Sequence, residues 1–231
     1  MPPSIPENLE KVRFRMSQFA QAYDRAAGTV ELIAVSKTHR PDKVREAYAA
    51  GQKHFGENYL QEALDKQSAL LDTDIIWHFI GPIQSNKTRD IAEHFAWVHS
   101  VDREKIARRL SEQRPDSLPP LQVLLQVNIS GEDSKSGVAV NDLPALAAFV
   151  SGLPNLLLAG LMAIPAQATG LENQRVPFRQ LREARDHLIS LGHKTCQHLS
   201  IGMSGDFEAA IAEGATLIRI GTDIFGPREN R

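Results

Sequence analysis

Short apolar segments alternate with longer amphipathic segments along most of the chain. The apolar segments, which we expect to be strands, are residues 31–37, 53–58, 75–80, 96–101, 121–128, 156–162, 196–200 and 216–221. Regular alternation of strands and helices predicts a parallel sheet, and eight such units in 231 residues predict an α/β fold, a single (β/α)8 TIM-type barrel. An open doubly wound sheet is the alternative, but no Gly-x-Gly-x-x-Gly turn follows the first segment.

An extra helix is predicted before the barrel. Apolar residues recur at roughly helical spacing over residues 6–27, and Gly28 follows, a residue that commonly ends helices. No connection between the later segments is long enough to separate two domains. We therefore predict one domain over residues 1–231, with the barrel itself at about 30–228.

The composition argues against several classes of protein. A net charge of −2, with 23% charged residues, leaves no electrostatic footprint for nucleic acid. Polar residues interrupt the apolar segments too often for a membrane span, and the first residues do not resemble a secretory signal. The single cysteine, Cys196, cannot form an internal disulfide and is interpreted as a packed small hydrophobe. We therefore expect a cytoplasmic protein that binds neither nucleic acid nor membrane.

The first strand segment ends in a lysine, Lys37. In a (β/α)8 barrel the functional site lies at the C-terminal ends of the strands. A partly apolar pocket there would lower the pKa of the amine, and a neutral amine is the form that makes a Schiff base with an aldehyde. The alternative is a lysine that reaches water or pairs with a carboxylate at the end of a strand.

Two turns that contain glycine follow the last two strand segments. The turn Gly202-Met203-Ser204-Gly205 precedes a short helical segment, and Gly221-Thr222 ends the eighth strand segment. Loops after strands seven and eight form the usual phosphate site of this barrel, because glycines let the backbone approach and amides and hydroxyls bind oxyanions. The alternative is that these glycines only form tight turns.

Three further polar residues lie inside strand segments. Arg219 lies among apolar residues of the eighth segment, where an unpaired cation is costly to bury. It either forms a structural ion pair or faces a ligand as a permanent cation. His78 and His99 lack the close spacing of metal ligands, so we expect no metal site and interpret both as buried, hydrogen-bonded histidines.

A lysine, a phosphate site and an arginine at one end of a barrel match one cofactor, pyridoxal 5′-phosphate (PLP). PLP carries an aldehyde, a phosphate and a ring nitrogen, and its enzymes hold the aldehyde on a lysine and place a protein group at the nitrogen. An acidic group there makes the ring a strong electron sink. An arginine would instead hold the nitrogen unprotonated and weaken the sink.

Several stretches of the chain resemble the pyridoxal phosphate homeostasis protein family, single-domain barrels related to the N-terminal domain of alanine racemase. They cover residues from about 31 to 228. The stretches are AVSKT (34–38), FGENY (55–59), WHFIGPIQSNK (77–87), VNI (127–129) through SKSG (134–137), GLM (160–162), LSIGMS (199–204) and RIGT (219–222).

The resemblance implies a role for each matching residue. It implies that Lys37 holds PLP as a Schiff base and that Arg219 faces the pyridine nitrogen. The implied phosphate contacts are Ser204, Gly221 and Thr222, and the other implied lining residues are Asn58, Met162 and Ser200. The chain departs from the residues expected of the family at three positions, Ile201, Gly205 and Asp223. These departures concern only the details of phosphate binding.

The family is described as binding and buffering PLP, with no established catalytic turnover. The resemblance therefore implies a non-catalytic carrier that serves intracellular PLP homeostasis and delivers the cofactor to apo PLP enzymes. Related racemases take a second base from an additional C-terminal domain and a dimer partner, whereas this chain ends soon after the eighth strand segment. We therefore expect a monomer with no catalytic residue. The alternatives are a PLP-dependent amino acid racemase or lyase and, less directly, a Schiff-base aldolase for a phosphorylated sugar.

Overall fold

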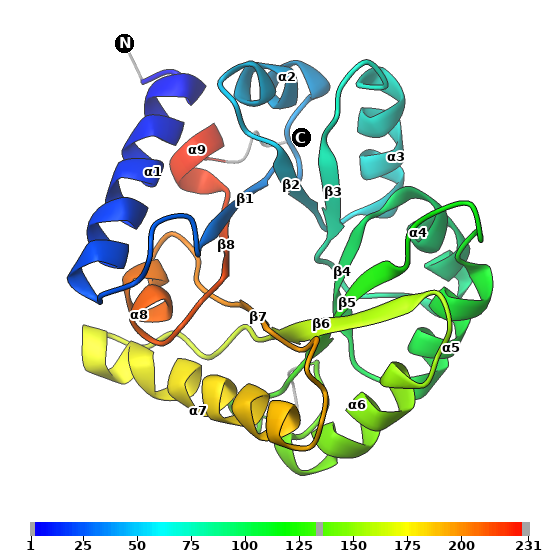
Figure 1. The fold of residues 1–231 in the computed structure, drawn as a ribbon. Helices are drawn as coiled ribbons and strands as arrows, with labels where there is room; N and C mark the ends of the chain where they lie inside the picture. The colour runs from blue at the N-terminus through cyan, green and yellow to red at the C-terminus, as the bar shows by residue number, and fades with distance from the viewer. Residues whose placement is uncertain (1–2, 133–135, 228–231) are drawn as a thin grey trace.

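The computed structural model describes residues 3–132 and 136–227, in which a ring of strands is surrounded by helices (Figure 1). The strands are β1 (Glu31–Val35), β2 (His54–Glu57), β3 (Ile76–Phe79), β4 (Trp97–Val101), β5 (Leu121–Gln126), β6 (Leu156–Met162), β7 (His198–Ser200) and β8 (Leu217–Ile220). The α-helices are α1 (Ile5–Ala22), α2 (Pro41–Ala49), α3 (Leu60–Ala69), α4 (Thr88–His94), α5 (Glu104–Gln113), α6 (Leu143–Ser151), α7 (Leu171–Ser190), α8 (Phe207–Ala212) and α9 (Thr222–Phe225). Short 3-10 helices occupy Ser85–Lys87 and Val140–Asp142.

The strands form a closed parallel barrel, which confirms the predicted fold. Each strand pairs with the next one along the chain, and β8 pairs with β1 through registers such as Ile33 with Arg219. An open sheet would instead leave two unpaired edge strands. The predicted barrel end at residue 228 and part of the SKSG stretch lie outside the described residues. Among the described helices, none is both long and apolar enough to cross a membrane.

Apolar side chains fill both the space outside the strands and the interior of the barrel. The large cluster lies between strands and helices, where Phe55, Phe178 and Phe207 are almost fully buried. The separate interior cluster comprises Ile33, Trp97, Leu124, Ala159, Met162 and Leu217. Cys196 is fully buried, as predicted, and burial raises the pKa of its thiol to about 12. The barrel is therefore a packed core rather than a pore.

The N-terminal helix is shorter than predicted. It begins with a reciprocal cap between Ser4 and Glu7 but ends at Ala22, not at residue 27. Asp24 adopts a left-handed backbone conformation with φ of 52°, which breaks the helix. The guanidinium of Arg25 then donates to the carbonyl oxygens of Ile211 and Ala215, at 3.1 and 3.0 Å. These tertiary contacts redirect the chain before the helical spacing of apolar residues ends.

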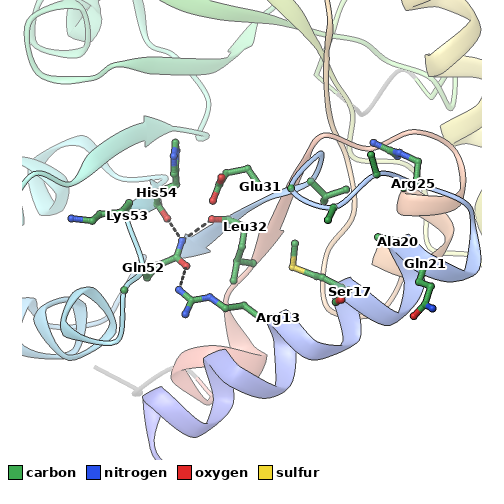
Figure 2. Close-up of a pocket in the computed structure, with 16 residues that line it drawn as sticks. Arg13, Ser17, Ala20, Gln21, Arg25, Glu31, Leu32, Gln52, Lys53 and His54 are labelled. Carbon is green, nitrogen blue, oxygen red and sulfur yellow. Dashed lines mark hydrogen bonds between the residues drawn. The ribbon is translucent and has the colours of Figure 1, made fainter.

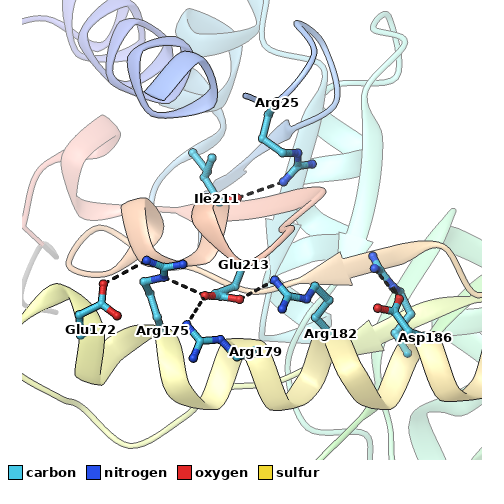
Figure 3. Close-up of polar contacts among 9 residues, drawn as sticks. Arg25, Glu172, Arg175, Arg179, Arg182, Asp186, Ile211 and Glu213 are labelled. Carbon is cyan, nitrogen blue, oxygen red and sulfur yellow. Dashed lines mark hydrogen bonds and ion pairs between the residues drawn. The ribbon is translucent and has the colours of Figure 1, made fainter. Parts of the chain in front are cut away.

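A buried carboxylate joins α7 to the end of α8 (Figure 3). Glu213 has no exposed surface and accepts hydrogen bonds from Arg175, Arg179 and Arg182, at 2.8, 3.0 and 2.6 Å. The three arginines lie four and three residues apart, so they share one face of α7. Burial alone would raise the pKa of Glu213, but the bonds from Arg179 and Arg175 and the charge of Arg182 lower it overall.

Replacing this carboxylate tests its contribution to stability. We expect Glu213→Gln to lower the free energy of unfolding at pH 7 by about 1–3 kcal/mol, because three cations lose a charged acceptor. The lowered folded-state pKa means that the carboxylate stabilises the fold above its unfolded pKa of about 4.3 and loses this effect as pH falls. The difference between variant and wild type should therefore shrink below about pH 4 in urea titrations.

Glu172 provides the matched control. Its side chain is 73% exposed and pairs with Arg175, so Glu172→Gln should cost less than about 0.5 kcal/mol. Equal losses from the two substitutions would contradict the importance of the buried carboxylate.

Candidate functional site

A cavity of about 790 Å³ opens at the C-terminal ends of β1, β2 and β8. Six of the eight predicted site residues line it: Lys37, Asn58, Ser204, Arg219, Gly221 and Thr222. Ile80, Ile164 and Met203 supply apolar walls. The cavity therefore combines one amine, one guanidinium and two glycine-containing turns in a single volume. The binding role of each residue stays a prediction.

Lys37 occupies a tight turn two residues beyond the end of β1. The His39 amide donates to the Ser36 carbonyl oxygen at 3.1 Å, and this bond closes the turn. Thr38 has a φ of 68°, at the position where such turns usually carry glycine. A threonine in this left-handed region is strained, so other contacts must hold the turn.

A buried ionic cluster holds the turn that carries Lys37. The ammonium of Lys66 donates to the Ser36 carbonyl oxygen, Glu57 and Glu62, at 2.6, 2.7 and 2.5 Å. Glu62 also accepts the amide hydrogen of Thr38 at 2.5 Å. Glu57 has no exposed surface, and burial raises the pKa of its carboxyl although Lys66 opposes this shift. The cluster thus fixes the residues on both sides of Lys37.

The turn after β7 supplies Ser204 to the cavity. Gly202 has a φ of 94°, and a Cβ there would lie 2.7 Å from the Ala210 side chain, so only glycine fits. Asp206 lines the same cavity and accepts the Met203 amide hydrogen at 2.6 Å. Burial raises the pKa of Asp206. In the described part of the chain, the amides of Ser204 and Gly205 donate to no acceptor.

Gly221 and Thr222 follow β8 directly. Thr222 begins α9, a short helix that the sequence pattern did not predict. A Cβ on Gly221 would lie 3.1 Å from the Val35 carbonyl oxygen, so this glycine lets the two strand ends approach closely. The first amides of a helix have no intrahelical acceptor. This turn can therefore present donors to an anion beside the Ser204 turn.

Arg219 lies at the inner wall of the cavity and is only 5% exposed. Its guanidinium donates to the carbonyl oxygens of Ser200 and Ala163, at 2.6 and 3.1 Å, and to the Ser200 hydroxyl. Burial lowers its pKa to about 10, with Asp206 opposing, so it stays charged at neutral pH. Within the described residues it is held by backbone and hydroxyl oxygens rather than by a salt bridge.

Two predicted residues, Ser200 and Met162, are not among those that line the cavity. Ser200 is fully buried behind Arg219, and Met162 belongs to the apolar cluster inside the barrel. Asn58 reaches the cavity, and its Oδ1 is buried without a hydrogen-bond partner. Gly81 permits this placement, because a Cβ there would lie 2.2 Å from the Asn58 carbonyl oxygen.

His78 and His99 are fully buried and hydrogen-bonded, as predicted. No group of three or more histidine, cysteine, aspartate or glutamate residues in the described ranges could hold a metal ion.

A second cavity, of about 700 Å³, lies at the opposite end of the barrel, between α1 and the N-terminal ends of β1 and β2 (Figure 2). The Gln52 amide bridges the carbonyl oxygens of Leu32 and His54, and Arg13 donates to Gln52. Arg25 binds backbone carbonyl oxygens as described above. The two arginines of this cavity, Arg13 and Arg25, therefore already have protein partners.

The sequence pattern missed the residues that hold the site in place. Lys66 lies four positions after Glu62 on α3, a spacing typical of exposed ion pairs on a helix surface. Asp206 directly follows the predicted glycine turn, and it was not identified from the sequence as a cavity residue. A buried lysine shows no distinctive signal in a single sequence. The burial of Lys66 on α3 depends on its contact with Glu57, which lies on β2.

Known proteins resemble this chain over nearly its whole length. Residues 8–229 match the family described as alanine racemase, N-terminal domain. A curated pyridoxal phosphate homeostasis protein from Pseudomonas aeruginosa is 62% identical, over 98% of this chain and 96% of that protein. The structure of PipY from Synechococcus elongatus with PLP bound is 38% identical, with a TM-score of 0.84 over 96% of this chain and 100% of that one. Alanine racemase from Corynebacterium glutamicum shares the fold at 19% identity and a TM-score of 0.69, with 98% of this chain and 61% of that one covered.

Removing the buried lysine tests the ionic cluster. We expect Lys66→Met to lower the free energy of unfolding by about 3–5 kcal/mol, because Glu57 is left buried without its counter-ion. The double variant Glu57→Gln, Lys66→Met should recover at least about 1 kcal/mol of this loss, since no uncompensated carboxylate remains. Urea unfolding at pH 7 measures both values, with the exposed Lys105→Met as control. A loss no larger than that of the control would argue against the cluster.

Proposed function

Because the chain belongs to the alanine racemase N-terminal domain family and, within it, to the pyridoxal phosphate homeostasis proteins, we propose that it holds PLP reversibly and buffers or delivers it. Lys37 would hold the cofactor as a Schiff base. The observation that carries the proposal is the meeting of Lys37, Arg219 and the two glycine turns in one cavity. Its partners would be apo PLP enzymes, and it would act as a cytoplasmic monomer.

The groups in the cavity fit PLP. The cofactor presents an aldehyde, a phosphate and a ring nitrogen, and the cavity presents an amine, a hydroxyl with two glycine turns, and a guanidinium. The amides of Ser204 and Gly205 have no acceptor within the described residues, and Asn58 Oδ1 is buried without a partner. A bound phosphate and a polar ring substituent would satisfy these groups.

Each residue would have a separate task. When bound, PLP supplies an aldehyde that reacts with amines and a conjugated ring that withdraws electrons. The strained turn places Lys37 at the cavity. Its amine would retain the aldehyde until another amine displaces it. Ser204 and the turn at Gly221 would hold the phosphate. Arg219 would donate a hydrogen bond to the ring nitrogen.

Two features of the cavity favour holding the cofactor over using it. The charge of Arg219 disfavours a second proton on an adjacent ring nitrogen, which keeps the ring a poor electron sink. Among the described residues that line the cavity, Lys37, Asp206 and Arg219 are the ionisable ones, and none is a histidine, tyrosine or cysteine. Asp206 already accepts a hydrogen bond from the Met203 amide. Apart from Lys37 and Arg219, the described lining therefore offers Asp206 alone as an acid or base for proton transfer.

A PLP-dependent racemase or lyase is the second candidate. Asp206 is the observation in its favour, because burial raises its pKa and it faces the same cavity as Lys37. A carboxyl group with a raised pKa can serve as a general acid.

Lys37→Ala tests the attachment point. We expect the variant to remain folded but to lose the visible absorption of the bound cofactor and the mass adduct that borohydride fixes. Lys53→Ala, at the other end of the barrel, should keep both signals. A borohydride adduct that persists on another lysine of the folded Lys37→Ala protein would contradict the assignment.

The carrier role is tested by comparing transfer with turnover. PLP-loaded protein should restore the activity of an apo PLP enzyme, at least about tenfold faster than Lys37→Ala protein exposed to the same amount of PLP. It should neither racemise amino acids nor exchange their α-hydrogen with D₂O at rates near the roughly 1–1000 s⁻¹ of enzymes. Sustained multiple-turnover racemisation by the unmodified protein would establish the second candidate instead.

A further inference from the structure

A continuous chain of hydrogen bonds crosses the interior of the barrel. His54 of β2 contacts His78 of β3 at 2.9 Å, and His78 contacts His99 of β4 at 2.9 Å. His99 then contacts the hydroxyl of Ser200 at 2.8 Å, on β7 at the far side of the barrel, and Ser200 accepts from Arg219. His78, His99 and Ser200 have no exposed surface, while His54 is half-buried at the N-terminal end of β2. The chain thus connects the opposite end of the barrel with the predicted ring-nitrogen residue.

The chemistry of Arg219 determines the direction of every bond in this chain. A guanidinium can only donate, so the Ser200 hydroxyl accepts from it and must send its own hydrogen elsewhere. Among the described residues, the other recorded contact of this oxygen is His99 Nδ1, which is therefore an acceptor. The proton of His99 is then on Nε2 and is donated to His78 Nδ1. His78 Nε2 donates in turn to His54 Nδ1.

The surroundings keep the histidines neutral, as this arrangement requires. Burial, followed by the charge of Arg219, lowers the pKa of His99 well below its usual range, and burial followed by the charge of His99 does the same for His78. Trp97 stacks on His78 with ring centres 5.5 Å apart. A further imidazole nearby, His198, also lowers the pKa of both rings; it contacts the Thr216 hydroxyl at 3.1 Å, and burial lowers its own pKa.

The guanidinium has donors to spare for a ligand. Its recorded acceptors are the Ser200 carbonyl, the Ser200 hydroxyl and the Ala163 carbonyl. Arginine carries five N–H groups, so two remain without a recorded acceptor within the described residues. Which way these two point depends on the three fixed bonds. One of the three, the bond to the hydroxyl, is favoured while His99 takes the serine hydrogen, because that hydrogen then points away from the guanidinium.

We propose that His99 is a positioning residue, which acts through Ser200 to hold Arg219 in the orientation that donates to the ring nitrogen of PLP. This inference rests on the proposed function. The chain through His78 and His54 fixes the proton of His99 on Nε2. His99 makes no recorded contact with the cavity and is not among its lining residues. If His99 could not accept, the serine hydrogen would compete with the guanidinium, and Arg219 would lose one of its three anchors.

The proton positions are tested on the protein without cofactor. Nitrogen-15 NMR of the histidine side chains should show His78 and His99 as neutral Nε2–H tautomers between pH 6 and 8. An Nδ1–H tautomer, or a charged ring, at either residue at pH 7 would overturn the proposal. This measurement depends neither on a variant that folds nor on PLP binding.

The effect on Arg219 is tested with two variants and two ligands. Asparagine places an amide oxygen near the position of Nδ1, so His99→Asn keeps an acceptor for Ser200, whereas His99→Phe fills the space without one. The ligands are PLP and its analogue in which a C–H group replaces the ring nitrogen. We expect wild type and His99→Asn to bind PLP at least tenfold more tightly than the analogue. We expect His99→Phe to reduce that preference to threefold or less.

The preference between ligands separates positioning from general packing damage, which would weaken both ligands equally. Retention of the tenfold preference by His99→Phe, or its equal loss in both variants, would overturn the proposal. Equal binding of PLP and analogue by wild type would overturn it while leaving the proposed function intact. No binding of either ligand by wild type would instead remove the proposed function, and the ring-nitrogen role with it.

Discussion

The pairing of β8 with β1 is the contact on which the candidate site depends. These strands are almost 190 residues apart in sequence, yet their pairing sets Ile33 beside Arg219 and Ala34 beside Ile220. The turn that carries Lys37 and the turn at Gly221 therefore emerge side by side. In an open sheet these two turns would lie at opposite edges. Barrel closure is thus what brings the Lys37 amine and the turn at Gly221 into one cavity.

The sequence predicted most of the fold and the outer layer of the site, because both follow from local patterns. The bounds of β6 match the predicted segment 156–162, since it is an apolar run with a clear stop. Lys37, Ser204 and Gly221 reach the cavity because strand ends in a parallel barrel meet at one face. Residues 23–27 were wrongly assigned to a helix because the contacts that redirect them come from the distant α8 region.

The inner support of the site could not be predicted for the same physical reason. Lys66 looks like half of an exposed helical pair until β2 places Glu57 beneath it. The bond between His99 and Ser200 joins residues 101 positions apart on non-adjacent strands. Buried polar groups of this kind add little to stability unless every member is satisfied, but they specify one arrangement of the interior. The buried polar residues therefore fix the geometry of the interior at the place where a ligand would bind.

The anchoring of the Lys37 turn by α3 has a consequence for the time scale on which the site can open. The first turn of α3 carries Glu62, and its N-cap residue, Tyr59, makes no side-chain capping bond. Helix ends can open locally at lower free energy than the whole domain unfolds, although the bonds of Glu62 to Thr38 and Lys66 oppose such opening here. Fraying of α3 would release the strained backbone at Thr38 while the eight strands stay paired. Exchange of a bound ligand would then require only local opening of the first turn of α3, and the barrel itself would stay closed.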